Sequence, residues 1–249
     1  MRTDPLGRRL LAEFLGTGLL VTAVVGSGIA AARLSPGNTG LELLENTAAT
    51  VGALVALILA LGPVSGAHFN PVVTLADRVF GGISTGDAAA YIGAQISGAL
   101  GGALLANAMF ALPTFEASTK TRSAGPLWLA EVVATFGLVV VIFGVVRSGR
   151  ASVAPFAVGA YIGGAYFFTS STSFANPAVT IGRTITDTFA GIRPSSAPAF
   201  IVMQLLGGAI AVATVRVLYP HVADSAANVV LPHPADSAGD GMQPKGVPA

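Results

Sequence analysis

The segment Phe174–Arg183, FANPAVTIGR, resembles a segment about a hundred residues earlier, His68–Arg78, HFNPVVTLADR. Both copies follow a long apolar run and place Asn directly before Pro. Asn is a favoured helix N-cap and Pro is favoured at the first helical position, so each copy predicts a helix start. The helical sequence then covers only about ten residues, over 70–79 and over 176–186. Since ten helical residues reach about 15 Å, half of the hydrocarbon core, each copy predicts a half-helix that starts near the middle of a membrane.

Composition places the rest of the chain in the membrane as well. Of the 249 residues, 53% are hydrophobic and only 10% are charged, whereas soluble domains carry about 25% charged residues. A membrane span needs about 20 apolar residues, and stretches of this kind cover 10–32, 46–64, 88–111, 127–147, 151–170 and 199–219. We therefore predict an all-α integral membrane protein with six transmembrane helices and two re-entrant half-helices.

Three polar residue pairs indicate an internal repeat. Glu13 and Glu131 are 118 residues apart, Asn70 and Asn176 are 106 apart, and Gln95 and Gln204 are 109 apart. Each half contains three spans and one half-span, and an odd number of crossings inverts the second half relative to the first. The two half-helices are then expected to enter from opposite faces and meet at the middle.

The domain prediction follows from this repeat. One membrane domain is expected over 1–219, with repeat halves at about 8–111 and 127–219. The remaining 220–249 are rich in Pro, Asp, Ala and Ser, and predict a disordered C-terminal tail. The basic residues form no dense cluster, so nucleic acid is not an expected partner.

Residues 8–219 resemble the aquaporin and glycerol-facilitator channels, the major intrinsic proteins, through AEFLGTGLL, SGAHFNP and the two boxes of Asn-Pro-Ala type. The boxes here are Asn70-Pro71-Val72 and Asn176-Pro177-Ala178. The resemblance implies a passive pore, one per subunit of a homotetramer, in which the two Asn amides face the lumen. Val72 replaces Ala, which we expect to narrow the pore slightly.

The selectivity filter departs from the family pattern. Relatives place an Arg directly after the second box, where this chain has Val179. The resemblance assigns the other filter positions to Thr50, Gly164 and Ser173. Such a ring is wide and uncharged, and selectivity depends on diameter and lining donors. Water, glycerol-like polyols and metalloid hydroxides such as arsenous acid are therefore the expected solutes; a bacterial subset with Val at this position is associated with arsenite.

Arg183 is a further candidate for the pore. It lies four residues after Val179, so both side chains lie on roughly one helix face. The equivalent position in the first half is Asp77 or Arg78, which favours a packing or surface role instead.

Five other polar residues are candidates for a role near the pore, and three of them have two readings each. Glu13 and Glu131 lie inside spans, where they serve either as a proton relay or as acceptors for the re-entrant loops; the repeat favours acceptors. His68 is either a pore base or metal ligand, or it orients its loop, and without a nearby His or Cys we expect the latter and no metal. Gln95 and Gln204 are expected to form hydrogen bonds between helices.

Two other function classes remain as alternatives. An ion- or proton-coupled transporter also uses broken helices and inverted repeats, but here the expected midplane holds only the Asn pair. A membrane enzyme needs a nucleophile with its base, or a metal cluster; the chain has no Cys, and neither enzyme activity nor a cofactor is expected. The loops on the side of the termini hold most basic residues, which predicts a cell-membrane protein with both termini cytoplasmic.

Overall fold

The computed structural model describes residues 5–220, and within that range the regular elements are all helical. The helices are α1 (Leu6–Leu34), α2 (Thr39–Ser65), α3 (Pro71–Phe80), α4 (Thr85–Met109), α5 (Gly125–Arg147), α6 (Ala154–Phe168), α7 (Pro177–Gly182) and α8 (Ala197–Leu218). Short 3-10 turns are η1 (Ala151–Val153), η2 (Arg183–Ile185) and η3 (Pro194–Ser196). The predicted tail lies outside the described residues, apart from Pro220.

Within the described residues, six helical segments are long and apolar enough to cross a membrane, which confirms the predicted spans. The shorter α3 and α7 begin at the two Asn-Pro boxes and are the predicted half-helices. The second one is shorter than expected, because α7 ends at Gly182 and the chain continues as the 3-10 turn η2. The fold class predicted from the sequence is therefore confirmed.

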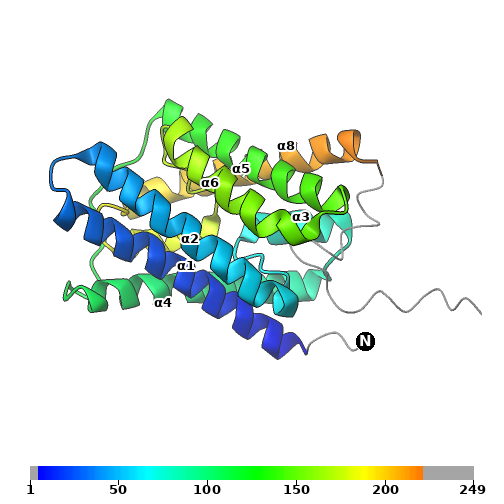
Figure 1. The fold of residues 1–249 in the computed structure, drawn as a ribbon, viewed down its shortest axis with the longest axis horizontal. Coiled ribbons are helices and arrows are strands. Elements are labelled where there is room, and N and C mark those ends of the chain that lie inside the picture. Colours follow the sequence, from blue (N-terminus) through cyan, green and yellow to red (C-terminus); the bar gives the residue numbers. More distant parts are fainter. Residues whose placement is uncertain (1–4, 221–249) are drawn as a thin grey trace, which may run out of the picture.

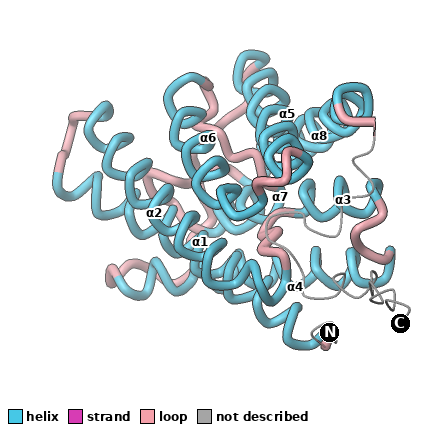
Figure 2. Tube along the Cα trace, turned by 45° about the vertical axis from the view of Figure 1, so that its right-hand side comes forward, coloured by secondary structure: helices cyan, strands magenta, loops and turns pink. Residues whose placement is uncertain are grey.

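The helices form two groups that correspond to the repeat halves. Helix α1 packs against α2 and α4, and α5 packs against α6 and α8. Figure 1 shows these groups as the lower and the upper part of the molecule, and Figure 2 shows α3 and α7 between them. Both half-helices contact both α4 and α8, so each joins the two groups.

Glycines allow the backbones of crossing long helices to come into direct contact. A Cβ on Gly102 of α4 would lie 2.1 Å from the carbonyl oxygen of Gly18 on α1, and one on Gly98 would lie 2.2 Å from that of Phe14. In the second half, a Cβ on Gly207 of α8 would lie 2.4 Å from the carbonyl oxygen of Val132 on α5. Small residues are the usual means of close helix packing in membranes.

Large apolar side chains cover the outside of the spans. On α1, Leu11, Leu15 and Leu19 recur at four-residue spacing, and they are 57%, 42% and 47% exposed. The same pattern continues on other helices, for example at Phe156 and Phe167 on α6. A helix that is apolar on both its packed and its outer faces is suited to a lipid surrounding, so the chain is a multi-pass membrane protein.

Candidate functional site

A narrow cavity of about 60 Å³ lies where the two half-helices meet. Most of its wall is apolar, and the apolar residues form pairs related by the repeat: Leu20 and Leu138, Val24 and Ile142, Leu54 and Val158, Ile58 and Ile162, Val73 and Val179. The polar residues on the wall are few: Thr50, His68, Asn70, Tyr166, Ser173, Asn176 and Arg183. A water site needs roughly 10–15 Å³ by such a measure, so the cavity has room for several water-sized molecules.

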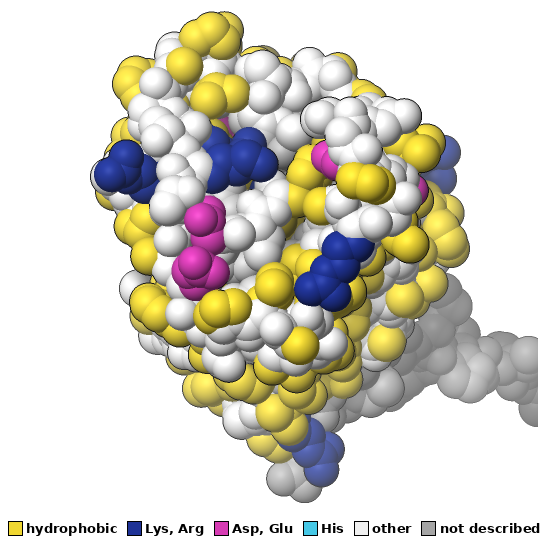
Figure 3. Space-filling view, turned by 90° about the vertical axis from the view of Figure 1, so that its left-hand side faces the viewer, with side chains coloured by type: hydrophobic (Ala, Val, Ile, Leu, Met, Phe, Trp, Pro, Cys, Tyr) yellow, Lys and Arg dark blue, Asp and Glu magenta, His cyan; other side chains and the backbone are white. Residues whose placement is uncertain are grey.

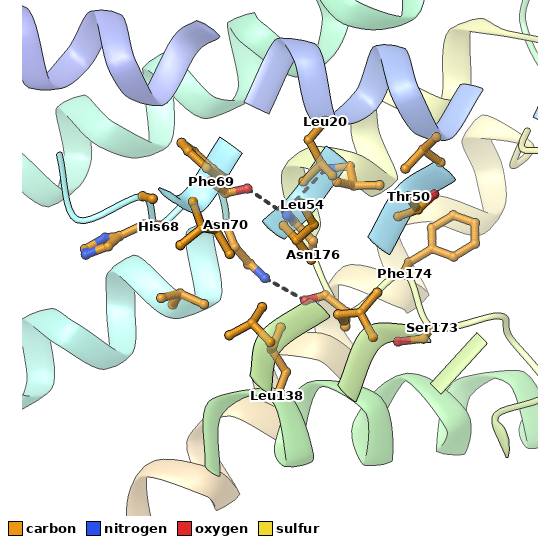
Figure 4. Close-up of a pocket in the computed structure, with 18 of the residues that line it drawn as sticks. Leu20, Thr50, Leu54, His68, Phe69, Asn70, Leu138, Ser173, Phe174 and Asn176 are labelled. Carbon is orange, nitrogen blue, oxygen red and sulfur yellow. Dashed lines mark hydrogen bonds between the residues drawn. The ribbon is translucent and has the colours of Figure 1, made fainter. Parts of the chain in front are cut away.

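Asn70 and Asn176 join the two half-helices at the centre of this cavity. Each side-chain oxygen caps its own helix: Asn70 accepts from the Val72 amide at 2.9 Å, and Asn176 accepts from the Ala178 amide at 3.0 Å. Each side-chain nitrogen donates to the opposite loop, Asn70 to the Ala175 carbonyl at 2.8 Å and Asn176 to the Phe69 carbonyl at 2.7 Å (Figure 4). An amide nitrogen carries two N–H groups, so each Asn keeps one N–H for a solute.

The re-entrant loop before each box has the same strained backbone in both halves. Ala67 and Phe69 have φ of 49° and 48°, and their repeat equivalents Ser173 and Ala175 have φ of 50° and 48°. Such conformations cost on the order of 1–3 kcal/mol each and persist only where the surroundings hold them. The surroundings here are two buried carboxylates.

Glu13 holds the first loop. It is fully buried, and its two oxygens accept from the backbone amides of His68 at 3.0 Å and Phe69 at 2.8 Å. The Ser65 hydroxyl donates to it at 2.7 Å and the Gln95 side chain at 2.8 Å. With four donors around it, Glu13 is placed as an acceptor for the loop, and it does not line the cavity.

Glu131 holds the second loop in the same way. It is fully buried and accepts from the backbone amides of Phe174 and Ala175, both at 2.9 Å, and from the Gln204 side chain at 2.6 Å. Gln204 also donates to the Thr180 hydroxyl at 2.9 Å, as Gln95 donates to that of Thr74 at 2.9 Å. Both glutamines thus connect a carboxylate to a half-helix.

The end of the cavity nearer the connection from α1 to α2, called the outer end below, comprises Thr50, Tyr166, Ser173, Val179 and Arg183. Figure 4 shows Thr50 and Ser173 on one side of the Asn pair and His68 on the other. Thr50, Ser173 and Val179 line the cavity as the sequence predicted, and the Tyr166 hydroxyl donates to the Thr50 hydroxyl at 3.3 Å. The Ser173 hydroxyl has no hydrogen-bond partner among residues 5–220.

The filter position predicted at Gly164 is wrong. Gly164 is exposed on the outside of α6 and does not line the cavity. The residues of α6 that do line it are Val158, Ile162 and Tyr166, which recur at four-residue spacing on the inner face. Gly164 is two residues from the inward-facing Ile162 and Tyr166, and a shift of two residues along a helix turns a side chain by about 200°.

The expected narrowing by Val72 is also wrong, because Val72 does not line the cavity. It points from α3 towards α8, where a Cβ on Gly208 would lie 2.3 Å from the Val72 Cγ1 atom. The absence of a side chain at Gly208 therefore makes room for the valine. Pro71, Pro177 and Ala178 are likewise buried at the helix starts and do not line the cavity.

This contact predicts compensation between two substitutions. Gly208→Ala should lower the free energy of unfolding by about 1–3 kcal/mol, as overpacking in a core does, and adding Val72→Ala should restore most of the loss. The apparent melting temperature of the four proteins in detergent measures the coupling. Val72→Ala alone should leave solute permeability unchanged, and a wider pore in that variant would contradict the placement of Val72.

His68 lies at the inner end of the cavity and is buried. Its Nδ1 atom is 3.0 Å from the Thr74 hydroxyl, and its Nε2 atom is 3.6 Å from a carboxylate oxygen of Asp77. The ring also meets the edge of Tyr91. His68 is thus placed both to orient the loop and to contact the lumen, and residues 5–220 contain no cluster of three metal-ligating side chains.

Basic groups surround the outer mouth. Figure 3 views the molecule from the side where α1 ends and α2 begins, and shows Lys and Arg side chains on both sides of a hollow. Arg183 lines the cavity itself. Lys120 is an exposed residue whose ammonium is held by the Phe189 carbonyl at 2.8 Å; partial burial, with Arg122 and Arg183 nearby, lowers its pKa to about 8. Asp187 is an acid in these loops, and hydrogen bonds from Thr119 lower its pKa.

The sequence did not single out several residues of this site. Tyr166 and Phe174 lie at its outer end, and Thr74 and Thr180 receive the glutamine bonds. The two threonines are 106 residues apart, the same offset as the Asn pair. The repeat offset was therefore a usable signal for them, whereas no repeat equivalent marks Tyr166, since position 62 is a glycine.

Comparisons with known proteins agree with this geometry. The family model described as "Major intrinsic protein" matches residues 1–173 and 156–243. The aquaglyceroporin AqpS of Rhizobium meliloti (strain 1021) is 50% identical over 216 residues, which cover 87% of this chain and 92% of AqpS. The probable aquaporin NIP4-2 of Arabidopsis thaliana is 34% identical over 187 residues, 72% of this chain and 65% of that protein. The X-ray structure of the aquaglyceroporin from Plasmodium falciparum aligns with a TM-score of 0.65 at 20% identity, covering 88% of this chain and 99% of that one.

Proposed function

Because the chain belongs to the major intrinsic protein family, whose members are membrane channels for water and small solutes, we propose that it passively conducts water, glycerol-like polyols and metalloid hydroxides such as arsenous acid, and that it excludes ions and protons. The observation that carries the proposal is the composition of the outer end. Val179 stands on the cavity wall at the position where the family pattern has an arginine, beside small polar side chains at Thr50 and Ser173.

The wall supports a preference for neutral solutes. Apolar side chains occupy most of it, and they cannot replace the hydration shell of an ion, whose transfer from water is very costly. The two half-helices present their N-termini to the centre, where each contributes a partial positive charge. Neutral molecules with hydroxyl oxygens accept hydrogen bonds from Asn70 and Asn176 and pass with little loss of hydration energy.

The Asn pair also supports proton exclusion. A water molecule at the centre accepts from the free N–H groups of both amides, so its own hydrogens turn outward towards the two ends. A file of water molecules oriented in opposite directions from its middle carries no continuous proton wire. The alternative, a proton-coupled carrier, receives no support from Glu13 and Glu131, since both bind loop amides away from the cavity.

Assembly and location complete the proposal. Family membership supports a homotetramer with one pore per subunit. The basic residues Arg8, Arg9, Arg78, Arg147 and Arg150 lie at or next to helix ends that we assign to the side of the termini, and this excess supports a cell-membrane protein with both termini in the cytoplasm.

Stopped-flow light scattering on proteoliposomes tests the proposal, with osmotic water flux compared with glycerol and arsenous acid entry. The wild type should pass all three. Val179→Arg should reduce entry of the two larger solutes about tenfold or more, which corresponds to a barrier increase of about 1.4 kcal/mol, and should retain water flux. Val217→Arg, the same change at an 82% exposed site, is the control. A wild type that moves only water would sink the proposal.

A further inference from the structure

The outer end of the cavity contains a cation even though the expected filter position is Val179. Arg183 lies at the start of η2, one turn beyond Val179, and is only 3% exposed. Its side chain lines the same cavity as Val179 and the Asn pair. The question is whether this arginine only packs the loop or whether it acts on the solute.

Contacts on one side of Arg183 fix the side chain. Its Nε donates to the carbonyl of Ala190, and its guanidinium carbon lies 3.4 Å from the centroid of the Phe174 ring. The two terminal nitrogens form no hydrogen bond with residues 5–220, although the side chain lines the cavity. A buried guanidinium whose stem is held and whose terminal donors are unpaired is placed to donate to a molecule in the cavity.

Arg122 adds a second guanidinium beside the same ring. It comes from the loop before α5, and its guanidinium carbon lies 5.1 Å from the Phe174 centroid. The Arg122 Nε donates to the Gly191 carbonyl at 3.1 Å. No carboxylate oxygen of residues 5–220 lies within 4.0 Å of either guanidinium. Two buried or half-buried cations without an ion-pair partner are costly, which is difficult to explain by packing alone.

The internal repeat gives a direct comparison. With the offset of 106 residues, Phe174 and Arg183 are equivalent to His68 and Asp77. In the first half these residues face each other, with His68 Nε2 3.6 Å from the Asp77 carboxylate, and Asp77 does not line the cavity. In the second half the ring is a phenylalanine and the arginine lines the cavity. The first half therefore has a carboxyl group at this position, away from the cavity wall, whereas the second half places a guanidinium group on the wall.

We propose that Arg183, held over Phe174 and supported by Arg122, is the cationic hydrogen-bond donor of this pore and selects solutes that carry several hydroxyl oxygens. The planar fork of a guanidinium offers two parallel N–H groups, which suit two neighbouring hydroxyl oxygens of a polyol or of a metalloid hydroxide. Its charge, with that of Arg122, repels cations at the outer end. Because Arg183 lies one turn beyond Val179, the pore gains this donor without an arginine at residue 179 itself. This inference rests on the proposed function and names the residue that sets its specificity.

Proteoliposomes with Arg183→Met, Arg183→Lys and Arg122→Met test the proposal, with Arg193→Met on the same face as the exposed control. Three quantities are measured: water permeability, glycerol permeability and sodium leak. Arg183→Met should lower the ratio of glycerol to water permeability about tenfold, the effect of losing about 1.4 kcal/mol of binding at the constriction, and should admit sodium. Arg183→Lys should still exclude sodium. Its ratio of glycerol to water permeability should lie between those of the wild type and Arg183→Met, since an ammonium is a point donor.

A purely structural Arg183 gives a different pattern. Water and glycerol permeability then fall together in Arg183→Met, with no sodium leak, and that result overturns the proposal, as does an unchanged ratio. If Arg183→Met does not fold, the glycerol-to-water ratio and the sodium leak are measured in Arg183→Lys and Arg122→Met instead. The expected changes are in the same direction and smaller. A wild type that conducts water alone contradicts the proposed function, whereas the sodium leak still tests the cationic barrier by itself.

Discussion

Replacing Gly102 by alanine should disrupt the first half of the channel. The added Cβ would lie 2.1 Å from the carbonyl oxygen of Gly18, far inside the contact distance. The Cβ position is fixed by the α4 backbone and the oxygen belongs to the α1 backbone, so neither atom can turn away. Helices α1 and α4 must separate, and the Thr22 hydroxyl then loses its bond to the Gly102 carbonyl. Overpacking of a core costs about 1–3 kcal/mol, and a backbone contact belongs at the upper end of that range.

The measurement is the apparent melting temperature of the purified protein in detergent. A loss of about 3 kcal/mol corresponds to a decrease of about 6–12 °C for a domain of this size. Gly101→Ala is the matched control, because a Cβ there meets no atom within 4 Å and alanine is the better helix former by up to about 1 kcal/mol. Equal melting temperatures for the two variants would contradict the close crossing of α1 and α4.

Glu131→Gln should collapse the outer half of the pore. The two carboxylate oxygens of Glu131 accept from the amides of Phe174 and Ala175, one on each oxygen. A glutamine in either orientation turns its NH₂ group towards one of these amides, so a buried N–H loses its acceptor. Each unsatisfied buried group costs about 1–3 kcal/mol, and the remaining bonds lose their charge assistance. The strained loop with φ of 50° at Ser173 then lacks the contact that holds it.

Water and glycerol permeability should therefore both fall at least about tenfold in Glu131→Gln, since the loop that carries Ser173 and Asn176 moves into the cavity. Proteoliposome flux measures the loss, and protein content per vesicle corrects for lower yield. The matched control is Glu116→Gln, the same change at an exposed loop residue, which should conduct like the wild type. Full flux through Glu131→Gln would show that its carboxylate does not hold the loop.

The spans and half-helices follow from the sequence more fully than the directions of the side chains at the site do. Spans and half-helices were predictable because lipid and buried backbone impose strict rules on length, hydropathy and capping. Thr50, Ser173 and Val179 lie on the cavity wall, because each lies close to a box or on a long span; their part in selectivity stays a prediction. Gly164 was misplaced because the loop before the box gives no fixed distance from α6 to Asn176.

Side chains near the boxes show the same limit. The residue after Asn70-Pro71 was expected in the lumen, but Val72 contacts Gly208. For Arg183 the repeat favoured a packing or surface role over a pore role, but its side chain lines the cavity. One residue along a helix changes the direction of a side chain by about 100°, so a sequence position fixes depth in the membrane much better than it fixes direction.

The sequence alone determined that this chain crosses a membrane six times, that two Asn-capped half-helices interrupt it, and that the halves are inverted, because hydropathy, capping and repeat offsets are local properties of the chain. Only the tertiary structure decided which atoms meet at the centre. The reciprocal bonds from Asn70 to Ala175 and from Asn176 to Phe69, and the stacking of Arg183 on Phe174, depend on how the helices rotate and approach each other. That geometry is set by how the helices of residues 5–220 pack together, through glycine contacts and buried carboxylates that lie far from the pore residues in sequence.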